Sequence, residues 1–301
     1  MDQGECEWQH ILPAFVISAP YLAVTRLALE FPRWHTFLEF HLIVLSLPNV
    51  TELHIISCVS EFSSNEDSDR VTPTPHAPRL KKIRVDVDWG TILSFWEGLR
   101  SYRSVYLDQL DEFHVINPSP DEFCAVIQTA SLASKNLQVL EIDCRRLFVH
   151  YDSLPLSISL DLNAITDLRL GVELSDETLL VIQWWIRSFK AVLEDSPVME
   201  RLTIKLRGYQ SPVTPGQLEP LKRAFEELSD LLSKLVRNVD LVFQVKTYDT
   251  YLGLCTNCLR GAIVGACKVL KEKVKLRAFE MTENTYDVPV SPFPTSTRRI
   301  F

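Results

Sequence analysis

Glycine is scarce in this sequence, at 9 of 301 residues, or about 3% against a usual ~7%. Glycine-rich phosphate loops need several glycines at fixed spacing, because only glycine lets the backbone approach a phosphate closely. The chain has no G-x-G-x-x-G and no G-x-x-x-x-G-K motif. The sequence therefore argues against the common glycine-rich nucleotide-binding folds.

An excess of positive charge is also missing, since 31 basic and 39 acidic residues give a net charge of −8. This balance argues against a general nucleic-acid binder. The apolar stretch from Ile11 to Val24 contains Pro13 and Pro20 and is shorter than the ~20 residues of a membrane span. The N-terminus has no basic start typical of a secretory signal. We expect a soluble protein of the cytoplasm or nucleus that binds neither nucleic acid nor membrane.

Catalytic and metal-binding signatures are not found either. The sequence has no serine nucleophile elbow and no H-E-x-x-H motif. Cys255 and Cys258 form a C-x-x-C pair, which is able to chelate a metal or act as a redox pair, but no histidine follows it and no second pair exists. We interpret these cysteines as structural thiols, and we expect no enzymatic activity, no cofactor and no metal.

A strand template recurs along the chain, with apolar residues at the first, fourth and sixth positions. In leucine-rich repeats such positions anchor a short strand in the core. The spacing is loose, from 22 to 40 residues between starts. The nine segments that fit are Val24-Leu27-Leu29, Val50-Leu53-Ile55, Leu80-Ile83-Val85, Tyr102-Val105-Leu107, Leu137-Leu140-Ile142, Ile165-Leu168-Leu170, Met199-Leu202-Ile204, Val236-Val239-Leu241 and Leu276-Phe279-Met281.

Amphipathic helices are predicted between these strands. Ser119-Pro120 starts one with a cap and a proline at the first helical position, and Ser175 and Pro220 each start another. The remaining helices are expected at 34–45, at 91–99 and near Leu259. Strand and helix therefore alternate, as in a parallel α/β protein.

The segments "LPNVTEL" at 47–53 and "NLQVLEI" at 136–142 resemble the strand entries of fungal F-box/leucine-rich-repeat proteins. This resemblance implies a curved array of strands that selects a substrate for a ubiquitin ligase. The F-box itself, a helical segment of such proteins entered by a Leu-Pro pair, is not evident. Its nearest candidate, Leu12-Pro13, leads directly into the first strand, so docking to a ligase adaptor is not implied.

We expect an α/β, leucine-rich-repeat-like solenoid with a parallel concave sheet, outer helices and irregular repeats. Residues 1–286 are expected to form this single array of about nine strand units, and residues 287–301 a proline-containing extension. Such a chain acts as a non-enzymatic scaffold for protein–protein interaction. The alternative is a compact α/β enzyme with an unrecognised carboxylate or thiol site.

Polar side chains between the anchors are expected to form two columns on the concave face, because side chains alternate along a strand. The first column would contain Arg26, Glu52, Lys82, Ser104, Val139, Asp167, Arg201, Asn238 and Ala278, and the second Ala28, His54, Arg84, Tyr106, Glu141, Arg169, Thr203, Asp240 and Glu280. This mixture of charges suits a protein partner. Single members are interpreted as solvated surface charges, whereas one cluster is the candidate protein-binding site: Lys82, Arg84, Tyr106, Glu141 and Arg169.

Overall fold

The structure is a computed structural model in which part of the chain is described. The described residues are 23–30, 37–56, 77–86, 95, 96, 99, 105–116, 118, 120–133, 135–144, 159–174, 178–192, 199–208, 215–248 and 275–286. They belong to two compact units, Met1–Phe113 and His114–Phe301. The predicted helix near Leu259 and the extension at 287–301 lie outside the described residues, so these two predictions stay predictions, as does the single array over 1–286.

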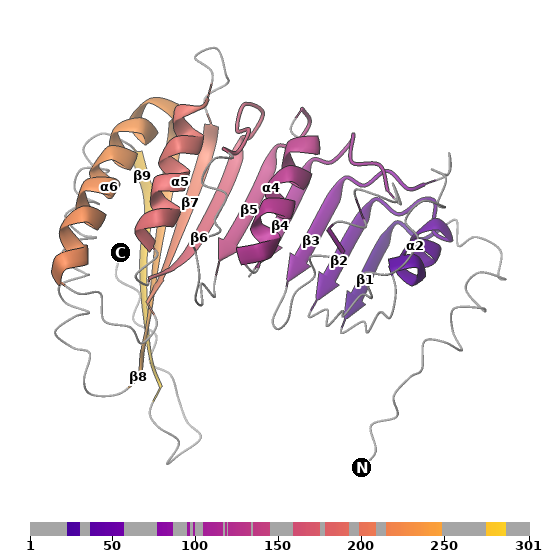
Figure 1. Cartoon of the computed structure of the whole chain (residues 1–301), viewed down its shortest axis with the longest axis horizontal. Coiled ribbons are helices and arrows are strands. Elements are labelled where there is room, and N and C mark those ends of the chain that lie inside the picture. The colour runs from indigo at the N-terminus through magenta and orange to yellow at the C-terminus, as the bar shows by residue number, and fades with distance from the viewer. Residues whose placement is uncertain are drawn as a thin grey trace. The chain divides into compact units, whose positions relative to one another are not determined.

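The first unit contains three parallel strands that follow chain order. They are β1 (Arg26–Glu30), β2 (Glu52–Ile56) and β3 (Lys82–Asp86), and α2 (Phe37–Leu45) lies between the first two in the chain (Figure 1). The anchors align as predicted, with Leu53 opposite Ile83 and Ile55 opposite Val85. All four of these side chains are at most 1% exposed, so the alternate apolar positions form the core face.

A chain of aromatic contacts runs through the core of the first unit. Phe40 of α2 packs edge to face on Phe95, with ring centroids 5.2 Å apart, and Phe95 packs in the same way on Trp96. Trp96 in turn contacts Phe113 at 5.7 Å. This edge-to-face geometry places ring hydrogens on ring faces and adds to the stabilisation from buried area.

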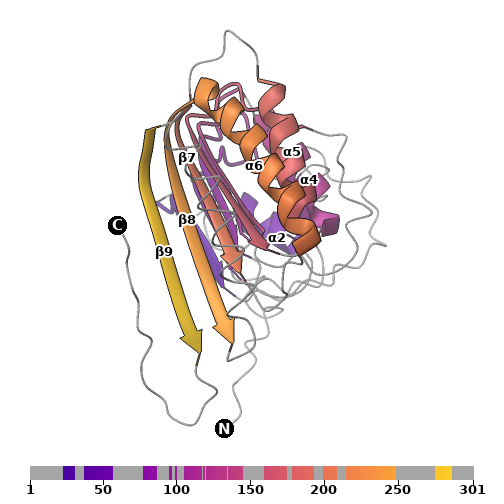
Figure 2. The same cartoon turned by 90° about the vertical axis from the view of Figure 1, so that its left-hand side faces the viewer.

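The second unit contains a longer run of parallel strands, again in chain order: β5 (Val139–Cys144), β6 (Asp167–Leu174), β7 (Met199–Gly208), β8 (Val236–Tyr248) and β9 (Lys275–Tyr286). Its helices α4 (Pro120–Ala133), α5 (Thr178–Lys190) and α6 (Pro215–Leu235) lie on one side of these strands, as Figure 2 shows. The described chain is therefore an α/β fold with parallel strands. No helix among the described residues is long and apolar enough to cross a membrane.

The predicted helix faces are buried against the strands. In α4 the buried stripe is Phe123, Val126, Ile127 and Ala130, and in α5 it includes Ile182, Trp185, Ile186 and Phe189. The start predicted for α6 was wrong, because the helix begins at Pro215 and Pro220 lies inside it. Proline is tolerated at a first helical position, so both prolines were possible starts and the earlier one is used.

The fourth strand also differs from its predicted place. The template at Tyr102-Val105-Leu107 was expected to form it, but the strand is β4 (Glu112–Ile116), which begins in the first unit and ends in the second. A second template, Leu110-Phe113-Val115, fits this position, and all three of its side chains are 0% exposed. Tyr106 takes part in strand pairing through an isolated parallel bridge with Arg79, outside the named strands.

The strands are entered through a recurring set of backbone hydrogen bonds. In the first unit the Thr25 carbonyl accepts bonds from the N–H groups of Thr51 and Glu52, and the Thr51 carbonyl accepts bonds from Lys81 and Lys82. In the second unit Gln138 and Thr166 each accept a pair of bonds in the same way. A tight turn precedes several of these entries, with the N–H donating three residues back: Val50 to Leu47, Leu110 to Leu107, and Ile165 to Leu162.

Candidate functional site

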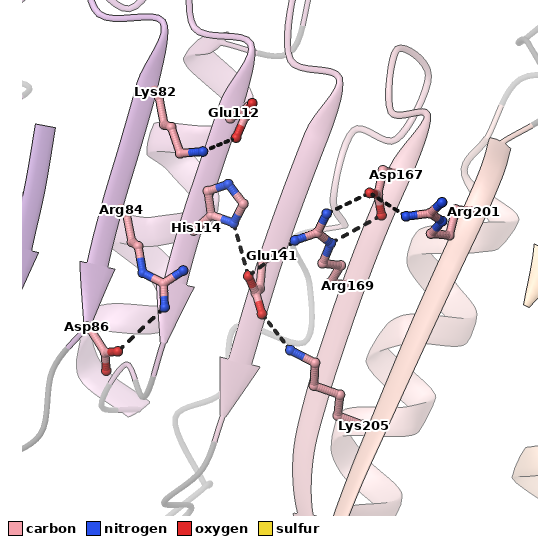
Figure 3. A network of polar contacts seen from close by, with 10 residues as sticks. All are labelled: Lys82, Arg84, Asp86, Glu112, His114, Glu141, Asp167, Arg169, Arg201 and Lys205. Atoms are coloured by element: carbon pink, nitrogen blue, oxygen red, sulfur yellow. Dashed lines mark hydrogen bonds and ion pairs between the residues drawn. The ribbon is translucent and has the colours of Figure 1, made fainter. Parts of the chain in front are cut away.

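The polar columns predicted from the strand template exist in the register of both units. Ala28, His54 and Arg84 are opposite one another in the first unit, and Glu141, Arg169, Thr203 and Asp240 in the second. The predicted register between the last two strands, β8 and β9, was wrong. Asp240 pairs with Ala278 rather than Glu280, next to a register irregularity. In the second unit, the side chains drawn in Figure 3 lie on the side of the strands away from the helices of that unit.

Glu141 is the centre of a charged cluster in the second unit (Figure 3). One of its carboxylate oxygens lies 3.0 Å from Nδ1 of His114, and the other accepts a hydrogen bond of 2.7 Å from Nζ of Lys205. Nη1 of Arg169 lies 4.0 Å away. The side chain of Glu141 is only 7% exposed and that of His114 only 5%. This carboxylate is therefore a buried charge with cationic groups on several sides.

These partners decide the ionisation of Glu141. Burial raises the pKa of the carboxyl, but the hydrogen bonds and charges of His114 and Lys205 outweigh it and lower the pKa from 4.5 to about 2. A buried carboxylate is tolerated when it is paired and hydrogen-bonded, and its partners cannot be removed singly without leaving a charge in a poorly solvated place. Glu141 thus stays ionised at neutral pH.

A second acidic group, Asp167, holds two arginines. Nε and Nη2 of Arg169 donate to its two oxygens at 3.3 and 2.8 Å, which is a bidentate pair. Nη1 of Arg201 lies 3.9 Å from the same carboxylate. Arg169 therefore lies between Asp167 and Glu141, and its guanidinium group is held in place from both sides.

Gly171 lies on the strand that the Lys205 side chain crosses to contact Glu141. In the register, Asp143, Gly171 and Lys205 are opposite one another on β5, β6 and β7, so Lys205 extends past β6 to a residue two strands away. A Cβ on Gly171 would lie 2.0 Å from Oδ1 and 3.1 Å from Cα of Asp143. The position therefore requires a residue without a side chain.

Ion pairs also follow the strands of the first unit. Nζ of Lys82 lies 2.5 Å from Glu112, and Arg84 lies 3.8 Å from Asp86 on its own strand. Burial and then the positive charge of Arg84 lower the pKa of His54, which is opposite Arg84 in the register. These contacts make a surface of mixed charge, as the sequence predicted.

The structure brings only some of the five predicted binding residues together. Glu141 and Arg169 are brought together, and Lys82 and Arg84 lie two residues apart on β3. Tyr106 lies outside the named strands, where the guanidinium of Arg79 stacks over its ring at 5.3 Å. Whether these residues bind a protein stays a prediction.

Two residues of the charged cluster around Glu141 were not predicted from the sequence: His114 and Lys205. His114 would have been found by the template Leu110-Phe113-Val115, which places it in the second column, where Tyr106 was expected. Lys205 lies two residues after Thr203 and so falls outside the two columns considered. No local pattern indicates that its side chain crosses a strand. Among the described residues no group of three histidine, cysteine, aspartate or glutamate side chains is placed to hold a metal ion. Cys255 and Cys258 lie outside the described residues.

Glu141→Gln is expected to remove a pH-dependent part of the stability. A folded-state pKa of about 2 against 4.5 stabilises the fold by about 3 kcal/mol above pH 4.5, and this contribution is lost as the pH falls towards 2. The free energy of unfolding, measured with urea from pH 7 to pH 3, should fall less steeply for the variant than for the wild type. Glu227→Gln, in the exposed pair with Lys190, is the control and should keep the wild-type slope. Equal slopes for all three proteins would contradict this account of Glu141.

Gly171→Ala is expected to destabilise the fold by about 1–3 kcal/mol, because the new methyl group displaces the buried Asp143 carboxylate. The measurement is equilibrium unfolding of the single variant. In an Asp143→Ala background the same substitution should cost less, since the nearest clash is with the carboxylate. An unchanged cost in that background would show that Gly171 is required for another reason.

Comparison with known proteins adds no assignment to this geometry. No protein-family model and no curated protein matches the chain.

Proposed function

We propose that this chain is a non-enzymatic scaffold that binds a protein through the polar face of its strands. In this proposal the chain is an irregular leucine-rich-repeat-like solenoid, similar to the substrate-recognition part of F-box proteins but without a clear F-box. The observation that carries the proposal is the recurring strand entry, in which one carbonyl accepts two N–H groups of the next strand in both units.

Several features support the solenoid. Strands follow chain order within each unit, whereas doubly wound sheets reverse their strand order at a switch point. The strand template also repeats with the same buried anchors. All three anchors are at most 4% exposed in each of the six templates that start at Val50, Leu80, Leu110, Leu137, Ile165 and Met199. Repetition of one buried unit, rather than one central core, is typical of solenoid proteins.

The chemistry of the charged cluster favours binding over catalysis. A general acid or base works best when its pKa is near the working pH. Glu141, with a pKa of about 2 and direct contacts to His114 and Lys205, is a poor proton acceptor. Instead, its pairing holds arginine and lysine side chains in fixed positions, and ordered arginines are frequent anchors of protein interfaces.

The solenoid predicts an extended particle. Small-angle X-ray scattering of the purified chain should give a radius of gyration above the ~19 Å of a compact 300-residue domain. An elongated distance distribution from the same data would support the repeat array. A radius near 19 Å with a symmetric distribution would favour the compact enzyme.

The binding role predicts a loss of client capture when the polar face is changed. The tagged chain, Arg84→Ala and Arg169→Ala are compared by affinity capture and quantitative mass spectrometry. Arg187→Ala on α5 and Lys222→Ala on α6 are the matched controls, because both side chains are exposed on the helices. One client should be depleted by the strand variants and kept by the controls, and co-capture of a ligase adaptor would extend the role to ubiquitin ligation. Equal recovery with all variants would remove the polar face as the binding site.

A further inference from the structure

Acidic and basic groups of the polar face in the second unit lie at different depths. The side chains of Glu141 and Asp167 are 7% and 18% exposed, whereas those of Arg169, Arg201 and Lys205 are 34%, 42% and 24% exposed. Asp143 is buried as well. Each basic group in these pairs is therefore more exposed than the acid it contacts. The less exposed carboxylates position the basic side chains, and the basic groups are the more accessible charges of this surface.

The backbone positions of the three basic residues are evenly spaced along the strand direction. Arg201 and Lys205 lie on β7, and Arg169 on β6 is opposite Thr203, midway between them. At ~3.3 Å per residue, the steps from Arg201 to Arg169 and from Arg169 to Lys205 each cover about 6–7 Å along the strands. Alternate side chains of an extended peptide repeat with the same distance. Figure 3 shows these three side chains around Asp167 and Glu141.

We infer that Arg201, Arg169 and Lys205 form a docking site for an extended acidic segment of a protein partner, with carboxylates at alternate positions. This inference rests on the proposed function and specifies the partner's chemistry. The complementarity is one of charge, because the partner carboxylates meet basic side chains whose positions the buried acids already hold.

A peptide suits this surface better than a single-stranded nucleic acid. Nucleic-acid grooves combine basic residues with aromatic side chains on which bases stack. The described polar-face positions of β5 to β7 contain no aromatic residue: Val139, Glu141, Asp143, Asp167, Arg169, Gly171, Arg201, Thr203 and Lys205.

Fluorescence anisotropy with labelled synthetic peptides tests the inference on the full chain. The probe alternates threonine and glutamate, a second peptide replaces glutamate by lysine, and an oligothymidylate of similar length is the third ligand. The glutamate peptide should bind most tightly, and its affinity should weaken with rising ionic strength. Arg201→Gln should weaken it by about 3–10-fold, because this arginine is the most exposed of the three.

Lys222→Gln on α6 is the matched control and should keep the wild-type affinity. Thermal unfolding of each variant separates a lost contact from a lost fold. Equal binding of the lysine peptide, tighter binding of the oligonucleotide, or an unchanged affinity in folded Arg201→Gln would each overturn the acidic-segment assignment. If a client is captured through Arg169 but the glutamate peptide does not bind, the proposed scaffold function stands and this inference fails.

Discussion

The pairing of two successive N–H groups with one carbonyl, at the entries of β2, β3, β4, β6 and β7, is the constraint on which the remaining structure depends. It sets where each strand starts relative to the one before it, as at Thr25 and Thr51 in the first unit and at Gln138 and Thr166 in the second. A one-residue slip would turn every apolar side chain to the polar face. Because the register is held, the apolar anchors form continuous buried columns and the polar residues form columns on the other face.

The charged cluster follows from this register. Glu141 and Arg169 are neighbours only because β5 and β6 start in step, and Arg201 reaches Asp167 for the same reason on β7. Burying Glu141 alone would cost several kcal/mol, which its partners offset through hydrogen bonds and charge. The favourable outcome is visible in the lowered pKa of Glu141. A cluster of this kind adds specificity to the stack, because each charge has a suitable partner only in the observed register.

Much of this arrangement could be predicted from the sequence, for physical reasons that also set the limits. A strand buried on one face requires alternation, so the anchors of β2, β3, β5, β6 and β7 and the polar columns between them followed from local patterns. Tyr106 was placed where His114 lies, because two templates, at 102–107 and 110–115, lie close together in the sequence and apolar content alone does not choose between them. In the structure the turn in which the Leu110 N–H donates to the Leu107 carbonyl precedes the second template, and the strand forms there. Contacts that skip a strand, such as that of Lys205, leave no local signal.

Gly171 shows why that last contact matters. In parallel strands that follow chain order, backbone hydrogen bonds connect each strand only with its neighbours, so the units of such a stack are coupled mainly in pairs. Lys205 and Glu141 join β7 to β5 across β6, which couples three strands through one ion pair. On the middle strand the residue opposite Lys205 is Gly171, which has no side chain. In a sequence so poor in glycine, this residue has a direct structural use, because a Cβ there would lie 2.0 Å from the buried Asp143 carboxylate.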